Sequence, residues 1–311
     1  LYQGIAKYFN PGATLLPEPP EAPAVENVGG GAVRVSWQPS TTDGVGLRGH
    51  GATGYRIYTS DDGIGWSNGT QVGNVTQHTI GGLSTGQLLF VRVTSTNAGG
   101  ESFPTETLAV RVGGGAELLL VNGFDRINET MTVYENDPVE GVNERMFLDR
   151  MNTHDYVIQH GEAVEAATIY AFDSASNEAV KSGRVNLNNY TIVDWILGEE
   201  STTYETLDAT ERSLVIAFTT NGGALFISGS EIGYHLAGTD PGFYSGVLRA
   251  SYVGDDAGTY SVYGTSGEFS GLGTFHFDAA GMYDPDWPDR LAPTSGSSEA
   301  VRYATGSSAG V

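Results

Sequence analysis

The chain has 311 residues, with 15 Lys and Arg against 37 Asp and Glu, so its formal net charge at pH 7 is −22. This excess of carboxylates argues against nucleic acids and anionic membranes as partners, because binding phosphates needs a basic surface. The absence of cysteine excludes disulfides, thiolate metal sites and cysteine nucleophiles. No apolar run approaches the roughly 20 residues that a membrane-spanning helix needs.

Residues 1–16 are interpreted as the helical end of a preceding domain. Ile5, Tyr8 and Phe9 have helical spacing, and the following Asn-Pro-Gly sequence would end a helix. Residues 17–23 contain four prolines, which predicts a stiff, extended linker. Since no initiator methionine or leader is visible, we expect the chain to be the interior of a longer polypeptide.

Residues 24–112 predict an all-β module. Apolar and polar residues alternate in several short segments that are separated by clusters of Gly, Asp, Asn and Ser. These segments are 32–37, 54–58, 75–80 and 89–93. The pattern is typical of a β-sandwich.

Three glycines at 113–115 predict a linker, and residues 116–311 predict an α/β domain. Strands are expected at 117–121, 190–197 and 223–228, with helices at 156–167 and 210–218. Alternation of strand and helix favours a largely parallel sheet with right-handed crossovers. From about residue 243, short Tyr-, Gly- and Ser-rich segments predict an antiparallel extension, and a strand-like segment near the end suggests that the domain is C-terminally incomplete.

The motif Gly229-Ser230-Glu231-Ile232-Gly233 follows a predicted strand, which is the context of a nucleophile elbow. Glu231 stands at the central position, and Ser230 with His235 is the nearby pair that acyl transfer could use. We favour the alternative in which the glycines shape a tight turn and the Glu231 carboxylate caps backbone N–H groups.

Asp194, Glu199 and Glu200 lie around the carboxyl end of the strand predicted at 190–197, where open α/β sheets bind ligands. Together with Asp173 and Glu231 they could form an acidic crevice. Paired carboxylates can hydrolyse glycosides or hold Ca²⁺. Structural hydrogen bonding at the strand ends is the alternative that we favour.

Metal ligands are not predicted among the six histidines, because none forms a close pair; His154 and His160, six residues apart, would not share a helix face. The acidic segment 284–289 offers oxygen ligands to calcium. Its two prolines favour instead a rigid loop with Trp287 packed beneath it.

The all-β module resembles a fibronectin type III domain. The resemblance rests on its Pro-rich start, on Val35-Ser36-Trp37, on 54–58 and on the closing segment 91–102. One departure lies between Leu83 and Leu89, where the family usually places a corner tyrosine. The resemblance implies a fold and no particular ligand.

The second domain resembles the region that accompanies fibronectin type III modules in secreted xanthan-lyase-like and cell-wall amidase proteins of the Bacteroidetes type. The segments that carry this are 172–180, 193–202 and 222–233. The implied fold is similar to flavodoxin-like, class I glutamine-amidotransferase-like domains. Those enzymes use a cysteine at the elbow, and this chain has none, so glutaminase-type activity is not expected.

Residues 1–9 resemble the last helix of a zinc-dependent N-acetylmuramoyl-L-alanine amidase domain. That resemblance implies a zinc enzyme upstream, none of whose zinc ligands lies in this chain. The leading hypothesis is a non-catalytic accessory region that positions or anchors a secreted peptidoglycan amidase at the cell envelope, with wall or surface glycan as its partner. The alternatives are a structural surface protein that assembles with copies of itself or mediates adhesion, and a glycan hydrolase that uses the acidic crevice.

Overall fold

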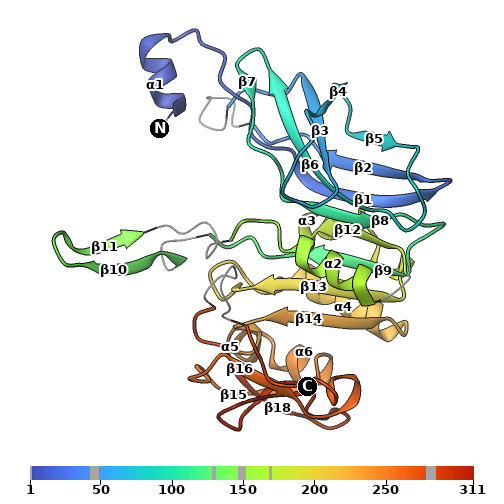
Figure 1. Ribbon diagram of the computed structural model, residues 1–311, viewed down its shortest axis with the longest axis vertical. Helices are drawn as coiled ribbons and strands as arrows, with labels where there is room; N and C mark the ends of the chain where they lie inside the picture. The colour runs from blue at the N-terminus through green and yellow to red at the C-terminus, as the bar shows by residue number, and fades with distance from the viewer. Residues whose placement is uncertain (1, 43–48, 128–130, 146–151, 168–169, 278–284) are drawn as a thin grey trace. The chain divides into compact units, whose positions relative to one another are not determined.

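The computed structural model describes residues 2–42, 49–127, 131–145, 152–167, 170–277 and 285–311 (Figure 1). The chain forms two compact units. Unit 1 comprises residues 1–122, 155–194 and 221–226, and unit 2 comprises residues 123–154, 195–220 and 227–311.

Unit 1 begins with helix α1, Tyr2–Phe9, and continues into a β-sandwich. Its strands are β1 Glu21–Gly29, β2 Ala32–Gln38, β3 Gly54–Ser60, β4 Thr70–Gly73, β5 Gln77–Ile80, β6 Leu88–Asn97, β7 Gly100–Glu101 and β8 Leu108–Arg111. Strands β1, β2 and β5 pair antiparallel in one layer, and β4, β3, β6 and β8 pair antiparallel in the other. The predicted helix and the four predicted strand segments are confirmed.

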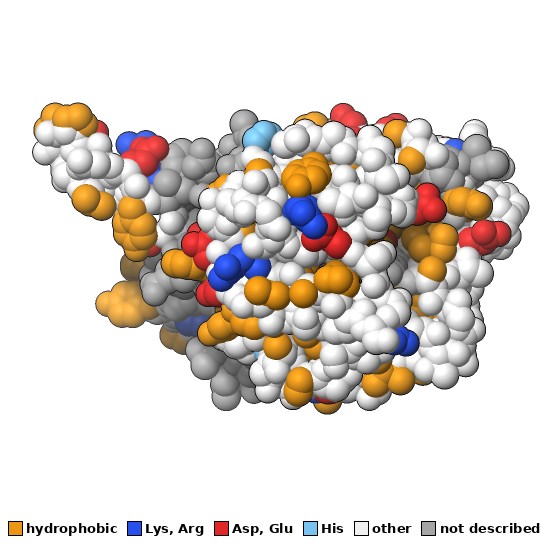
Figure 2. Space-filling model, turned by 90° about the horizontal axis from the view of Figure 1, so that it is seen from below, with side chains coloured by type: hydrophobic (Ala, Val, Ile, Leu, Met, Phe, Trp, Pro, Cys, Tyr) orange, Lys and Arg blue, Asp and Glu red, His pale blue; other side chains and the backbone are white. Residues whose placement is uncertain are grey.

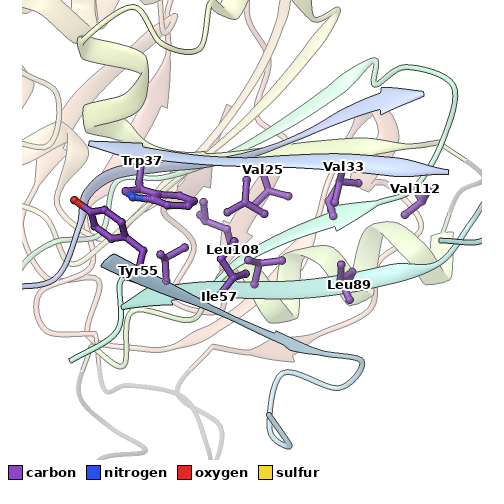
Figure 3. Packing of buried hydrophobic residues seen from close by; sticks show 12 residues of the cluster. Val25, Val33, Trp37, Tyr55, Ile57, Leu89, Leu108 and Val112 are labelled. Carbon is purple, nitrogen blue, oxygen red and sulfur yellow. The ribbon is translucent and has the colours of Figure 1, made fainter. Parts of the chain in front are cut away.

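The sandwich core follows from the alternation along its strands, because every second side chain of a strand points to the same face. Val33, Val35 and Trp37 of β2 are buried in one cluster with Tyr55 and Ile57 of β3. Trp37 lies beside Tyr55 in this core (Figure 3). The Trp37 and Tyr55 rings are 5.2 Å apart between centroids. This packing of large side chains stabilises the module mainly by removing apolar surface from water.

Unit 1 also contains the first strands of the following α/β region. Strand β9, Leu118–Asn122, pairs in parallel with β12, Phe172–Ser176, as a strand-helix alternation requires. Strand β12 pairs antiparallel with β1 at Ala24 and Val25 and with β8 at Arg111. The sandwich and the α/β strands therefore share hydrogen bonds, and the linker predicted at 113–115 stays a prediction.

The remaining elements of this part are helices α2 Val157–Ala167 and α3 Asn177–Lys181, the 3₁₀ turn η3 Leu187–Asn189, and strands β13 Ile192–Gly198 and β14 Ala224–Gly229. The strand order is β14-β13-β9-β12-β8-β6-β3-β4. Strands β13 and β14 begin in unit 1 and end in unit 2. The strands predicted at 117–121, 190–197 and 223–228 are confirmed, and so is the mixed α/β character of the region.

Unit 2 contains a hairpin, three helices and an antiparallel sheet. The hairpin is β10 Val133–Asp137 with β11 Gly141–Arg145, and the helices are α4 Ala209–Thr220, α5 Ile232–Thr239 and α6 Pro241–Gly246. The sheet contains β15 Ala250–Gly254, β16 Ser261–Gly264, β17 Phe275–His276, β18 Arg290–Pro293, β19 Val301–Tyr303 and β20 Ser308–Gly310, and η4 Gly267–Phe269 is a 3₁₀ turn.

The antiparallel extension is confirmed, although it begins at β15, because Pro241 and the capping Asp240 start a helix before it. The strand-like segment near the end forms β19, which pairs with β16 and β20.

Hydrophobic side chains on the face seen in Figure 2 are scattered among polar groups. None of the described helices is long and apolar enough to cross a membrane.

Candidate functional site

The turn between β14 and α5 lacks the geometry of a nucleophile elbow. Glu231 has φ −120° and ψ 26°, outside the left-handed region, and its side chain is 8% exposed. Ser230 N donates a hydrogen bond to Gly198 O (2.8 Å), which ties the turn to the end of β13. An elbow instead strains the backbone to expose its central side chain. The Glu231 side chain is buried, which is the opposite of what an elbow requires.

The helix cap at this turn comes from another residue. Glu231 makes no side-chain cap hydrogen bond, so its predicted capping role is wrong. Asp289 Oδ2 accepts hydrogen bonds from Gly233 N (2.6 Å) and Tyr234 N (3.0 Å) at the start of α5. Gly233 permits this approach, because a Cβ atom there would lie 2.6 Å from Tyr244 Oη and 3.0 Å from Asp289 Oδ2.

Ser230 and His235 bind separate partners in the structure. Ser230 Oγ donates to Gly198 O (3.4 Å). His235 is 3% exposed, and its Nδ1 accepts the Thr206 backbone N–H at 3.1 Å, with the Thr206 hydroxyl 2.7 Å away. Burial also lowers the pKa of His235. His235 Nδ1 thus already accepts a hydrogen bond from Thr206. This arrangement indicates a structural role for His235 and not that of a base for Ser230.

Asp173 and Asp194 belong to unit 1 and have structural partners there. Asp173 accepts hydrogen bonds from the backbone and side-chain amides of Asn27 and from the Tyr190 hydroxyl. Burial raises the pKa of Asp173 to about 6. Asp194 Oδ2 lies 2.6 Å from His160 Nδ1 on α2. Each carboxylate therefore connects neighbouring elements of unit 1 by hydrogen bonds or an ion pair.

Glu199 and Glu200 follow directly after β13 in unit 2 and are 4% and 1% exposed. Glu200 Oε1 accepts hydrogen bonds from the backbone N–H groups of Asp125 (2.6 Å) and Arg126. Glu199 Oε1 accepts from Asp286 N at 2.8 Å, and Arg126 Nη1 donates to Glu199 O at 2.7 Å. The two carboxylates hold separate loops against the end of one strand.

The electrostatics of this cluster follow from its burial. Burial raises the pKa of Glu199 and of Glu200 to about 7, and it raises the pKa of Glu231 above its ordinary value. Glu199 and Glu231 act on each other, so the structure brings together two of the predicted crevice residues. Asp289, which the sequence analysis considered only as part of the acidic segment 284–289, also has its pKa raised by burial, to about 7. No local pattern could have indicated that Asp289 caps α5, because the N–H groups that it accepts lie 55 and 56 residues away.

The acidic segment near Trp287 also differs from expectation. Among the residues that the structure describes, no group of three His, Asp or Glu side chains is arranged to hold a metal ion. Asp284 lies outside those residues. Trp287 is 56% exposed, so the prediction that it packs beneath the loop is wrong. The reason is local: Pro285 and Pro288 on either side are the buried positions.

Comparisons with known proteins identify one domain. Residues 18–111 match the fibronectin type III domain family, so this part of the chain is a fibronectin type III domain. Titin domains A168–A170 are 25% identical over 30% of this chain and 30% of theirs, with a TM-score of 0.26. The twitchin kinase region from C. elegans is 27% identical over 41% of this chain and 20% of that one, with a TM-score of 0.25.

The FN5 domain of Drosophila Lar is 19% identical and matches over its whole length and 32% of this chain, with a TM-score of 0.26. The chain spans less than a third of the titin and twitchin structures that it matches.

Proposed function

We propose that this chain is a non-catalytic accessory region of a secreted cell-wall amidase, and that it positions or anchors the enzyme at the cell envelope. The observation that supports this most is that the carboxylates at the strand ends form structural hydrogen bonds. Glu199, Glu200 and Asp289 are buried, and each accepts backbone N–H groups from another part of unit 2. A general acid or base must instead reach a proton on the substrate.

The hydrogen bonds between the fibronectin type III domain and β12 support a positioning role. Asn27 in β1 donates its side-chain amide to Arg111 O, Phe172 O and Asp173 Oδ1, and its amide oxygen accepts Gly113 N. Linkers between independent domains leave few contacts across the boundary. These bonds instead make unit 1 a continuous spacer, as a region that holds another domain at a distance requires.

The glycan-hydrolase alternative needs two carboxylates on either side of an open substrate site. Glu199, Glu200 and Glu231 are each at most 8% exposed, so this arrangement does not favour hydrolysis.

The proposal is tested by incubating the purified chain with peptidoglycan sacculi. We expect the chain to sediment with the wall without releasing reducing ends or free L-alanine amino termini. The control is Glu231→Gln, which should bind equally. Release of products that disappears in a folded Glu231→Gln variant would make Glu231 catalytic and refute the proposal. Failure to sediment would refute anchoring, and ordered assemblies detected by light scattering would then favour a self-assembling surface protein.

A further inference from the structure

Trp287 combines exposure with an unfavourable backbone conformation. Its side chain is 56% exposed, and its φ of 53° lies in the left-handed region that bulky L-residues rarely adopt. Exposing a large aromatic ring and straining its backbone both oppose folding. Such a residue persists where the surrounding structure holds it, and strained positions cluster at ligand sites.

The surrounding structure does hold this loop. On one side, Asp286 N is bound by Glu199 Oε1 at 2.8 Å. On the other side, Pro288 O accepts Ala257 N at 3.0 Å and Asp289 N donates to Ser230 O at 2.9 Å. Residues 286–289 around the indole are thus held by backbone hydrogen bonds before any ligand arrives, which reduces the entropy lost on binding.

Oxygen acceptors and further aromatic rings border the loop. Asp255 is exposed and lies between Gly254, which pairs with Arg290, and Ala257, whose N–H donates to Pro288 O; Arg290 Nη2 also donates to Asp255 O at 3.2 Å. Tyr234, which is 48% exposed, lies 6.2 Å from Tyr252 between ring centroids. An aromatic face with a carboxylate at its margin suits a sugar ring, whose C–H groups stack and whose hydroxyls donate. The net charge of −22 disfavours an anionic ligand.

We propose that Trp287 is a stacking platform for a ring of a neutral wall glycan, with the exposed carboxylate of Asp255 accepting hydrogen bonds from its hydroxyls. This inference rests on the proposed function, because it names the surface with which the chain meets the wall. The probe is the β-linked N-acetylglucosamine tetrasaccharide, a neutral and soluble piece of such a chain.

Tryptophan fluorescence gives a direct readout. Trp37 and Trp195 are 0% exposed, and Trp66 is covered by the Arg92 guanidinium 4.1 Å from its ring centroid. A change on adding the tetrasaccharide should therefore come from Trp287 and disappear in Trp287→Phe. By calorimetry, Trp287→Ala should bind about tenfold more weakly or worse, whereas Trp287→Phe should keep most of the affinity because it retains an aromatic face. Trp66→Ala is the matched control and should bind like the parent.

The platform would be overturned by the absence of tetrasaccharide binding to the parent chain, or by unchanged affinity in a folded Trp287→Ala variant. Thermal midpoints within a few degrees of the parent identify the folded variants. If parent and Trp287→Ala sediment equally with sacculi, the platform is refuted while anchoring stands. If the parent binds the tetrasaccharide through Trp287 but not sacculi, anchoring is refuted while the platform stands.

Discussion

Asp289 is the residue on which the start of α5 depends. Its carboxylate satisfies two N–H groups that a helix leaves without intrahelical partners. We expect Asp289→Ala to lower the free energy of unfolding by about 1–2 kcal/mol, because both N–H groups would lose their acceptor and the Gly233 N–H is buried. Asp289→Asn keeps an acceptor and should cost less. The measurement is urea unfolding at pH 7.

Glu231→Gln is the matched comparison for Asp289→Ala. It retains the size of the side chain and removes a charge that burial disfavours, and no cap hydrogen bond is lost. We therefore expect the free energy of unfolding to stay unchanged or to rise slightly. If Glu231→Gln destabilised the chain as much as Asp289→Ala, the assignment of the cap to Asp289 would be wrong.

Strand β12 joins the fibronectin type III domain to the α/β region by pairing with β1. The side chain of Asn27 in β1 adds hydrogen bonds across this junction. We expect Asn27→Ala to lower the unfolding free energy by about 2–3 kcal/mol, because four hydrogen bonds are lost and buried groups of Asp173, Arg111 and Phe172 lose a partner. The measurement is again urea unfolding.

The control for Asn27→Ala is Asn143→Ala in the hairpin, where the side chain is partly exposed and its amide donates to Gly141 O at 3.3 Å. That change should stay within about 0.5 kcal/mol of the parent. Equal effects of the two substitutions would contradict a special role for Asn27.

The elements show which features sequence patterns could predict. Strands β2 and β3 largely follow the period-two alternation that burial of one sheet face imposes, and β9 and β13 follow the apolar runs of a covered sheet. Strand β12 follows neither pattern, because Asp173, Ser174 and Ser176 are buried polar residues. Each forms hydrogen bonds with a distant or a local partner. Ser174 Oγ accepts Ala109 N, and Ser176 Oγ accepts Ala179 N as the N-cap of α3.

The candidate site was also predictable only in part, because several of its residues have partners far away in the sequence. Position after a strand placed Glu199, Glu200 and Glu231 near one another, and Glu199 and Glu231 do interact. The pattern could not separate Asp173 and Asp194 from them, nor could it add Asp289, because those outcomes depend on contacts between residues far apart in sequence.

For the whole molecule, the buried carboxylates make stability depend on pH. Burial raises the pKa of Glu199, Glu200 and Asp289 to about 7, and of Asp173 to about 6, above the values in an unfolded chain. Between about pH 4.5 and 7 the folded state then binds more protons than the unfolded state, so stability falls as pH rises through this range. We expect a higher thermal midpoint at pH 5.5 than at pH 8.5.

The second oxygens of Glu200 and Asp289 are buried without a hydrogen-bond partner among the described residues, which adds to the cost of their ionised forms. The triple variant Glu199→Gln, Glu200→Gln, Asp289→Asn should therefore flatten the pH dependence of the midpoint. A variant with the full dependence of the parent would show that other groups are responsible.

The net charge of −22 produces a second, separable dependence, on salt. Like charges on the surface repel at low ionic strength and are screened over about 3 Å at 1 M salt, so the thermal midpoint at pH 8 should rise between dilute buffer and 1 M NaCl. An unchanged or lower midpoint would contradict this. Buried carboxylates are screened much less than exposed ones, so the difference between pH 5.5 and 8.5 should largely persist in 1 M NaCl. If salt removed that difference, surface repulsion rather than Glu199, Glu200 and Asp289 would be its cause.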